Sequence, residues 1–123
     1  MNAYVAAPLC AEAERELARE GGKAGDVRVR VVCLDEAESG GRLDLAATGA
    51  NARRVTEDST SIAYLEASDS RATRFAKPIV EEAGIAWLEA SSGSTAMRRL
   101  LSAIAESDTT SLRDSVRENL DQP

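Results

Sequence analysis

The residues of this chain that could do chemistry are carboxyl and hydroxyl side chains that follow two nearly identical apolar segments. Residues 62–68 read IAYLEAS and residues 85–91 read IAWLEAS, so each segment contains a glutamate near its end, Glu66 or Glu89. The hydroxyl residues that follow are Ser68, Ser70, Ser91, Ser92, Ser94 and Thr95. If the segments are neighbouring parallel strands, these side chains meet at the edge where open α/β sheets bind ligands.

The two glutamates occupy equivalent positions in the repeat. In neighbouring strands in register, Glu66 and Glu89 would lie about 5 Å apart between backbones. Such a pair could serve acid–base chemistry or a metal ion, and the like charges would raise the pKa of one carboxyl if water is excluded. The alternative, which we favour, is two solvated acids, because exposed carboxylates are common without a function. We therefore expect no catalytic residue and no metal site.

The hydroxyl residues also allow two interpretations. Together with free N–H groups at the starts of the following helices, they could hold a carboxylate. They could equally serve only as helix caps. The two cysteines, Cys10 and Cys33, follow or end predicted strands, and neighbouring parallel strands would bring both to one edge. A disulfide is possible there, but we expect two buried free thiols.

The elements that would position these groups alternate along the chain. Apolar patterning predicts strands at residues 4–9, 27–34, 62–65 and 85–88, and helices at 11–20, 43–55, 70–83, 94–105 and 111–120. A turn is expected at 38–41. We expect Asp69 or Ser70, and then Ser94 or Thr95, to cap the third and fourth helices, and Pro78 to kink or restart the third. This alternation predicts a single α/β domain, a three-layer α/β/α fold around a four-stranded parallel sheet.

Composition excludes several classes of function. The chain has 123 residues, a net charge of −6 and no histidine, and its arginines are scattered through the helices beside acids instead of forming a basic patch. Nucleic acid is therefore not an expected partner, and the commonest general base is missing. No phosphate-binding glycine motif is present, so no cofactor is expected. No apolar run approaches the roughly 20 residues of a membrane span. No signal peptide is visible, which leaves the compartment open.

A resemblance adds to this interpretation. The pieces that carry it are Asn51-Ala52-Arg53-Arg54, Ile62-Ala63-Tyr64-Leu65, Asp69-Ser70-x-Ala72-Thr73, Pro78-Ile79-Val80 and Ala83-Gly84-Ile85. Their order and spacing resemble the first lobe of the periplasmic solute-binding proteins of branched-chain amino-acid ABC transporters. Residues 96–104 and 111–117 resemble a much later segment of that family, where the chain has returned from the second lobe. The chain thus looks like one lobe with the second lobe cut out, with βα repeats at 1–93 and returning helices at 94–123.

The resemblance implies a sheet order of 2-1-3-4, a Rossmann-like lobe and an extracytoplasmic location. It also implies a small amino-acid-like ligand held by Ser70, Ser91 and Gly93, with Ser92 and Ser94 nearby. Two departures stand out, because Cys10-Ala11-Glu12 replaces a Ser-Gly-Pro-like turn and Glu66 replaces a glycine. Glu66 would repel a ligand carboxylate.

The expected function is therefore at most weak binding of an amino-acid-like or small carboxylate ligand, without catalysis. The alternative is a non-catalytic interaction or dimerisation domain, or a remnant that has lost its ligand. A lone lobe exposes an edge or a helix face that a second lobe would cover, so we expect a homodimer.

Overall fold

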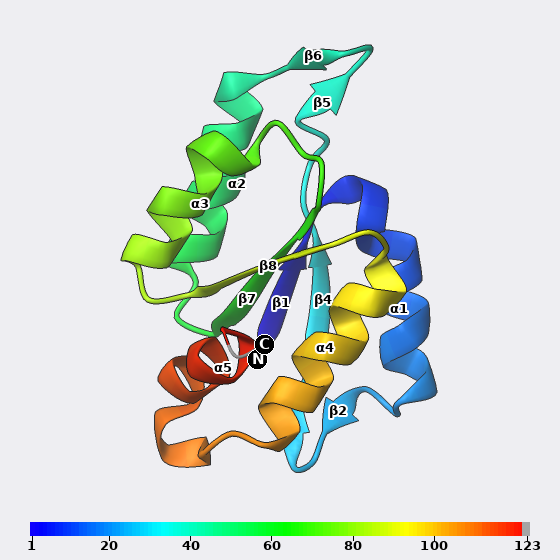
Figure 1. Cartoon of the computed structure of the whole chain (residues 1–123), viewed down its shortest axis with the longest axis vertical. Coiled ribbons are helices and arrows are strands. Elements are labelled where there is room, and N and C mark those ends of the chain that lie inside the picture. Colours follow the sequence, from blue (N-terminus) through cyan, green and yellow to red (C-terminus); the bar gives the residue numbers. More distant parts are fainter. Residues whose placement is uncertain (122–123) are drawn as a thin grey trace.

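The central sheet has four parallel strands, as the alternation of elements predicts. The structure, a computed structural model, describes residues 1–121. The sheet order is β4-β1-β7-β8 (Figure 1), with β1 at Asn2–Val5, β4 at Arg30–Cys33, β7 at Ser61–Ala67 and β8 at Ala86–Ala90. Counted along the chain, this is the order second, first, third, fourth, which confirms the 2-1-3-4 arrangement.

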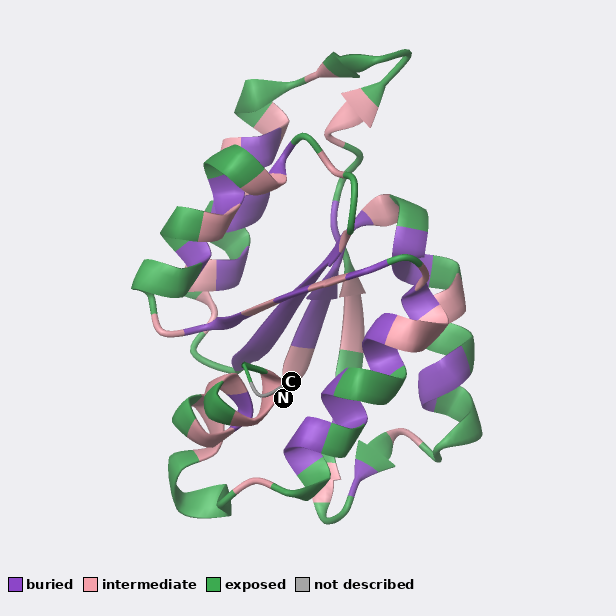
Figure 2. Ribbon diagram, viewed as in Figure 1, coloured by how far each residue is buried: buried purple, intermediate pink, exposed green. Residues whose placement is uncertain are grey.

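Helices cover both faces of the sheet and complete a three-layer α/β/α fold. One face carries α1, α4 and α5, at Cys10–Arg19, Gly93–Ala105 and Leu112–Leu120. The other carries α2 and α3, at Leu45–Glu57 and Thr73–Glu82. Buried residues line the inward faces of these helices and nearly all of β1 and β7 (Figure 2). Because strand side chains alternate between faces, the sheet separates two apolar cores.

The repeated segments lie side by side in register. Tyr64 pairs with Trp87 and Glu66 pairs with Glu89 across the β7–β8 ladder. The Tyr64 and Trp87 rings stack with their centroids 4.3 Å apart, on the side of the sheet that α2 and α3 cover. Aromatic stacking adds to the burial of both rings. The repeat therefore marks two adjacent strands that end at one edge.

Several predicted boundaries are wrong for local reasons. The first strand ends at Val5 instead of Leu9, because Pro8 has no N–H for the ladder and lies in a 3-10 turn, η1, at Ala7–Leu9. The second strand is divided into β3 at Val27–Arg28, which pairs with β2 at Lys23–Ala24, and β4.

The remaining short elements connect the helices. The predicted turn at 38–41 is a hairpin of β5 at Glu38–Ser39 and β6 at Arg42–Leu43, which Gly40 and Gly41 join with φ of 59° and 78°. Glycine readily adopts this left-handed backbone. A second 3-10 turn, η2, lies at Thr109–Ser111. No helix within residues 1–121 is both long and apolar enough to cross a membrane.

The predicted caps of the third and fourth helices are also wrong. α3 begins at Thr73 without a side-chain cap, and the Ser70 hydroxyl oxygen accepts a hydrogen bond from the Ala72 amide before the helix starts. α3 runs through Pro78. The cap of α4 is Ser92, whose extended backbone lets its hydroxyl oxygen accept from the Thr95 amide at 3.2 Å. Ser94 and Thr95 lie inside the first turn of α4 instead.

Candidate functional site

A pocket of about 170 Å³ opens at the carboxyl edge of the sheet, on the side of α2 and α3. The turn after β1, the segment after β4, the end of β7 with its following loop, and α2 all contribute to its wall. In Figure 1 this region lies beneath the β5–β6 hairpin, between α2 and the upper ends of β4 and β7. The pocket thus lies at the edge that the repeated segments predict.

Glu66 is the buried carboxyl group of this pocket. Its residue is only 4% exposed, and burial raises the pKa of the carboxyl because it disfavours the charged form. The Ala67 amide, which donates to Glu66 Oε1 at 2.9 Å, and the Ser70 and Tyr64 hydroxyls act in the opposite direction. Among charged groups, Glu38 adds to the rise. The favoured interpretation of two solvated acids is therefore wrong for Glu66, and burial, not Glu89, is the largest cause of its raised pKa.

Asn51 supplies the second buried polar group. It lies on α2, is 2% exposed, and its Nδ2 donates to the Asp35 carbonyl oxygen at 2.9 Å. That carbonyl can only accept, so the amide orientation is determined and Oδ1 points away from it. Oδ1 is buried and has no hydrogen-bond partner among the described residues. Such a group costs free energy unless something donates to it.

The pocket wall is acidic. Five lining residues carry carboxyl groups, and residues 1–121 contribute no lysine or arginine to the lining; the five are Asp35, Glu36, Glu38, Glu66 and Asp69. The nearby Arg71 directs its guanidinium to the Gly41 carbonyl, and its amide donates to Glu38 Oε1 at 2.6 Å. The site therefore offers hydrogen-bond acceptors and negative charge, which suit a positively charged hydrogen-bond donor.

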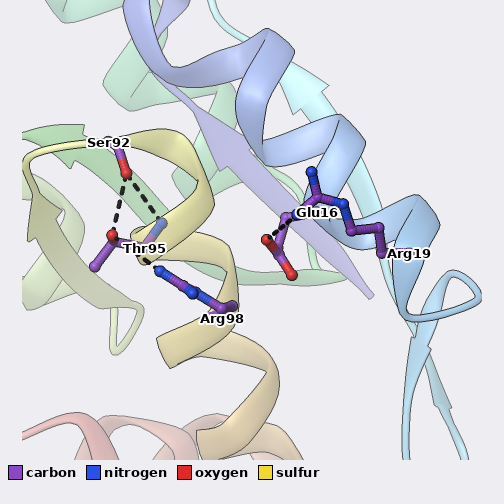
Figure 3. Close-up of polar contacts among 5 residues, drawn as sticks. All are labelled: Glu16, Arg19, Ser92, Thr95 and Arg98. Carbon is purple, nitrogen blue, oxygen red and sulfur yellow. Dashed lines mark hydrogen bonds and ion pairs between the residues drawn. The ribbon is translucent and has the colours of Figure 1, made fainter.

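The serines and glycine proposed as ligand contacts divide into two places. Ser70 lines the pocket. Ser91, Ser92, Gly93 and Ser94 lie at the start of α4, outside the pocket lining. Figure 3 places Ser92 beside Thr95, where the hydroxyl groups lie 3.1 Å apart, with Arg98 donating to Thr95 Oγ1 at 3.4 Å. Binding by these four residues stays a prediction.

The start of α4 already has a carboxylate partner from the chain itself. The Gly93 amide donates to Glu12 Oε1 at 3.1 Å. A carboxylate at a helix N-terminus is favourable because the free N–H groups carry partial positive charge. Glu12 therefore takes the kind of position that a ligand carboxylate would need.

The expectation of two free thiols is wrong, because Cys10 and Cys33 form a disulfide with their Cα atoms 5.7 Å apart. It joins the start of α1 to the end of β4. Glu14 Oε1 lies 3.0 Å from Cys33 Sγ and 3.4 Å from Cys10 Sγ. These are contacts and not hydrogen bonds, since bonded sulfur atoms carry no hydrogen to donate. The sulfur atoms are committed to each other, so we assign no metal site to this group.

Sequence reasoning missed Asn51 and the acids that follow β4. One available signal was Asn51 itself, a polar residue on the buried stripe that Thr48, Ala52 and Val55 otherwise form on α2. An amide on a buried helical stripe needs partners, so it indicates a polar site nearby. The acids of residues 35–38 gave no such signal, because solvated acids in loops are ordinary.

Replacing Glu66 with glutamine is expected to stabilise the protein at neutral pH, on the order of 1 kcal/mol for one poorly solvated buried group. Because the pKa of Glu66 is raised in the folded state, the folded protein binds the proton more tightly than the unfolded chain does. Wild-type stability therefore falls as pH rises through the window between the two pKa values. The advantage of Glu66→Gln should be smallest at low pH and grow across that window.

Urea denaturation at a series of pH values measures this difference. Glu36→Gln, an exposed carboxyl at the same pocket, is the control and should change stability by less than about 0.5 kcal/mol. A Glu66→Gln advantage that shrinks as pH rises would contradict the assignment.

No protein-family model matches this chain, and no match is found among curated proteins or solved structures.

Proposed function

We propose that this lobe is a non-enzymatic binding module that holds a small solute reversibly at the carboxyl edge of its sheet. The observation that carries this proposal is the pocket at that edge, which combines a buried carboxyl, Glu66, with Asn51, whose Oδ1 has no hydrogen-bond partner within residues 1–121. Ligand sites in open α/β folds lie at this edge, and they pair a few convergent polar groups with apolar walls. The alanines and Pro8 of the lining supply the apolar part.

Binding by the lobe should be weak. A pocket of about 170 Å³ is smaller than the roughly 300–1,000 Å³ of most small-molecule sites. In the resembled family, a second lobe closes over the ligand from the opposite side. One wall alone covers less of the ligand, so more of its surface stays in water.

A thermal-shift screen tests the proposal. The panel holds amino acids, small carboxylates and small amines, and sodium chloride of equal ionic strength is the control. A solute at about ten times its Kd should raise the free energy of unfolding by about 1.4 kcal/mol, because it binds only the folded state. If no member of the panel raises the melting temperature beyond the salt control, the binding function is wrong.

A second candidate is a self-association domain, which we propose on the exposed face of α3. Phe75 and Ile79, four residues apart on this helix, are each 45% exposed. Arg74 lies near its start, and Glu81 and Glu82 lie at its end. In an antiparallel pair of α3 helices related by a two-fold axis, Arg74 of each copy faces the acids of the other.

This candidate predicts dimers that dissociate when the apolar contact carries a charge. Ile79→Asp should shift the light-scattering mass from dimer toward monomer at the same protein concentration, because the aspartate would be buried without a partner. Glu57→Gln, an exposed change on α2, should leave the mass unchanged. A wild-type protein that stays monomeric at millimolar concentration would rule out this candidate.

A further inference from the structure

We propose that the pocket selects the ammonium group of a small primary amine that carries no carboxylate, an inference that rests on the binding function proposed above. The shared property of the two buried groups is that both accept hydrogen bonds. Glu66 offers its carboxylate oxygens. Asn51 offers its Oδ1, because its Nδ2 already donates to the Asp35 carbonyl oxygen. Both residues line the pocket, and a primary ammonium, with three donors and a positive charge, suits acceptors of this kind.

The surrounding charge selects the same chemistry. Asp35, Glu36, Glu38 and Asp69 also line the pocket, and the described lining contains no basic side chain that could receive a ligand carboxylate. An α-amino acid would bring its own carboxylate into this negative field, at a cost in Coulomb energy. An amine without that group gains the attraction alone. The acidic wall therefore favours amines over the amino acids that the family resemblance implies.

The helix N-terminus that follows β8 already holds an acid of the chain. In many α/β sites such an end receives the anionic part of the ligand. Here Glu12 of the same chain accepts from the Gly93 amide at the start of α4. A ligand carboxylate would have to displace that contact, which lies outside the pocket lining. The start of α4 is therefore not free to receive a ligand carboxylate.

A metal ion suits the pocket less well than an ammonium. Within residues 1–121, the only group of three or more possible metal ligands that converge to within 4.8 Å is Cys10, Glu14 and Cys33. The acids of the pocket do not form such a group. Calcium and magnesium need several oxygen ligands at short range, whereas an ammonium needs only separate acceptors around it.

Isothermal titration calorimetry of the full chain with its disulfide intact tests the selection. The probes are propylamine hydrochloride, sodium propionate, alanine and calcium chloride at neutral pH and constant ionic strength. Propylammonium should bind at least about tenfold more tightly than propionate or alanine. Glu66→Gln should weaken that binding at least about tenfold, since it removes the buried negative charge.

Glu89→Gln is the matched control, because Glu89 occupies the same place in the repeated segment and does not line the pocket. Its affinity for propylammonium should stay within about twofold of wild type. Near-UV circular dichroism confirms that both variants are folded.

Tighter binding of propionate or alanine would overturn the amine selectivity but leave solute binding in place. Binding of calcium in place of propylammonium would have the same meaning. Binding unchanged by Glu66→Gln would overturn the assignment to this pocket. Heat from none of the probes would overturn both the selectivity and the proposed function.

Discussion

Replacing Gly93 with alanine is expected to lower the free energy of unfolding by about 3 kcal/mol, the range of severe overpacking. A Cβ atom at this position would overlap the Leu9 carbonyl oxygen and lie 2.8 Å from the Ala13 backbone nitrogen. Both obstacles are backbone atoms, so no side-chain rotation relieves them. The start of α4 must then move away from α1, and the 3.1 Å hydrogen bond from the Gly93 amide to Glu12 is lost or weakened.

Gly49→Ala provides the matched control for this prediction. Gly49 lies inside α2, and a Cβ atom there would meet only the end of the Arg53 side chain, at 3.5 Å. Alanine in a helix interior is more favourable than glycine by up to about 1 kcal/mol, so this variant should be more stable than wild type. Urea denaturation followed through the fluorescence of Trp87, the single tryptophan, measures both. Equal stability of Gly93→Ala and wild type would show that α4 does not approach the start of α1 this closely at Gly93.

Reduction of the Cys10–Cys33 disulfide is expected to lower the free energy of unfolding by about 3 kcal/mol. The bond closes a loop of 23 residues, and a cross-link of that length restricts the unfolded chain by roughly this amount. Cys33 is exposed, so a dithiol reductant in solution can reach the bond. The urea midpoint of wild type should therefore fall when reductant is added.

The double variant Cys10→Ala/Cys33→Ala is the control for reduction. Its free energy of unfolding should match that of the reduced wild type within about 1 kcal/mol, and its urea midpoint should not respond to reductant. A thiol assay establishes that the wild-type bond is open. A wild-type midpoint that stays constant although both thiols are free would contradict the prediction.

The disulfide also restrains one wall of the pocket. Cys33 ends β4, and the next residues include Asp35, Glu36 and Glu38 of the pocket wall. β4 is an edge strand that pairs only with β1 in the sheet. The bond therefore limits how far this wall can move, and its loss should weaken the proposed binding as well as lower stability.

Much of the fold follows from local patterns in the sequence. The apolar runs and their helical spacing predicted four parallel strands, the helices between them and the three-layer arrangement, because each pattern depends on residues close together in the chain. The twin IAYLEAS and IAWLEAS segments also predicted adjacent strands, and the pairing of Tyr64 with Trp87 confirms that register. Boundaries were wrong where one residue changed the backbone, as Pro8 did after β1.

The site depended on contacts that no local pattern records. Asn51 on α2 and Glu66 on β7 meet the residues after β4 at one pocket only because the sheet places β1 between β4 and β7. Gly93 meets Glu12 across 81 residues of sequence. The burial that raises the pKa of Glu66 is likewise a property of packed neighbours. The sequence alone determined the elements and the edge of the sheet where the strands end, because periodicity is local. Only the tertiary structure decided which acids are buried at that edge, because burial depends on segments brought together from distant parts of the chain.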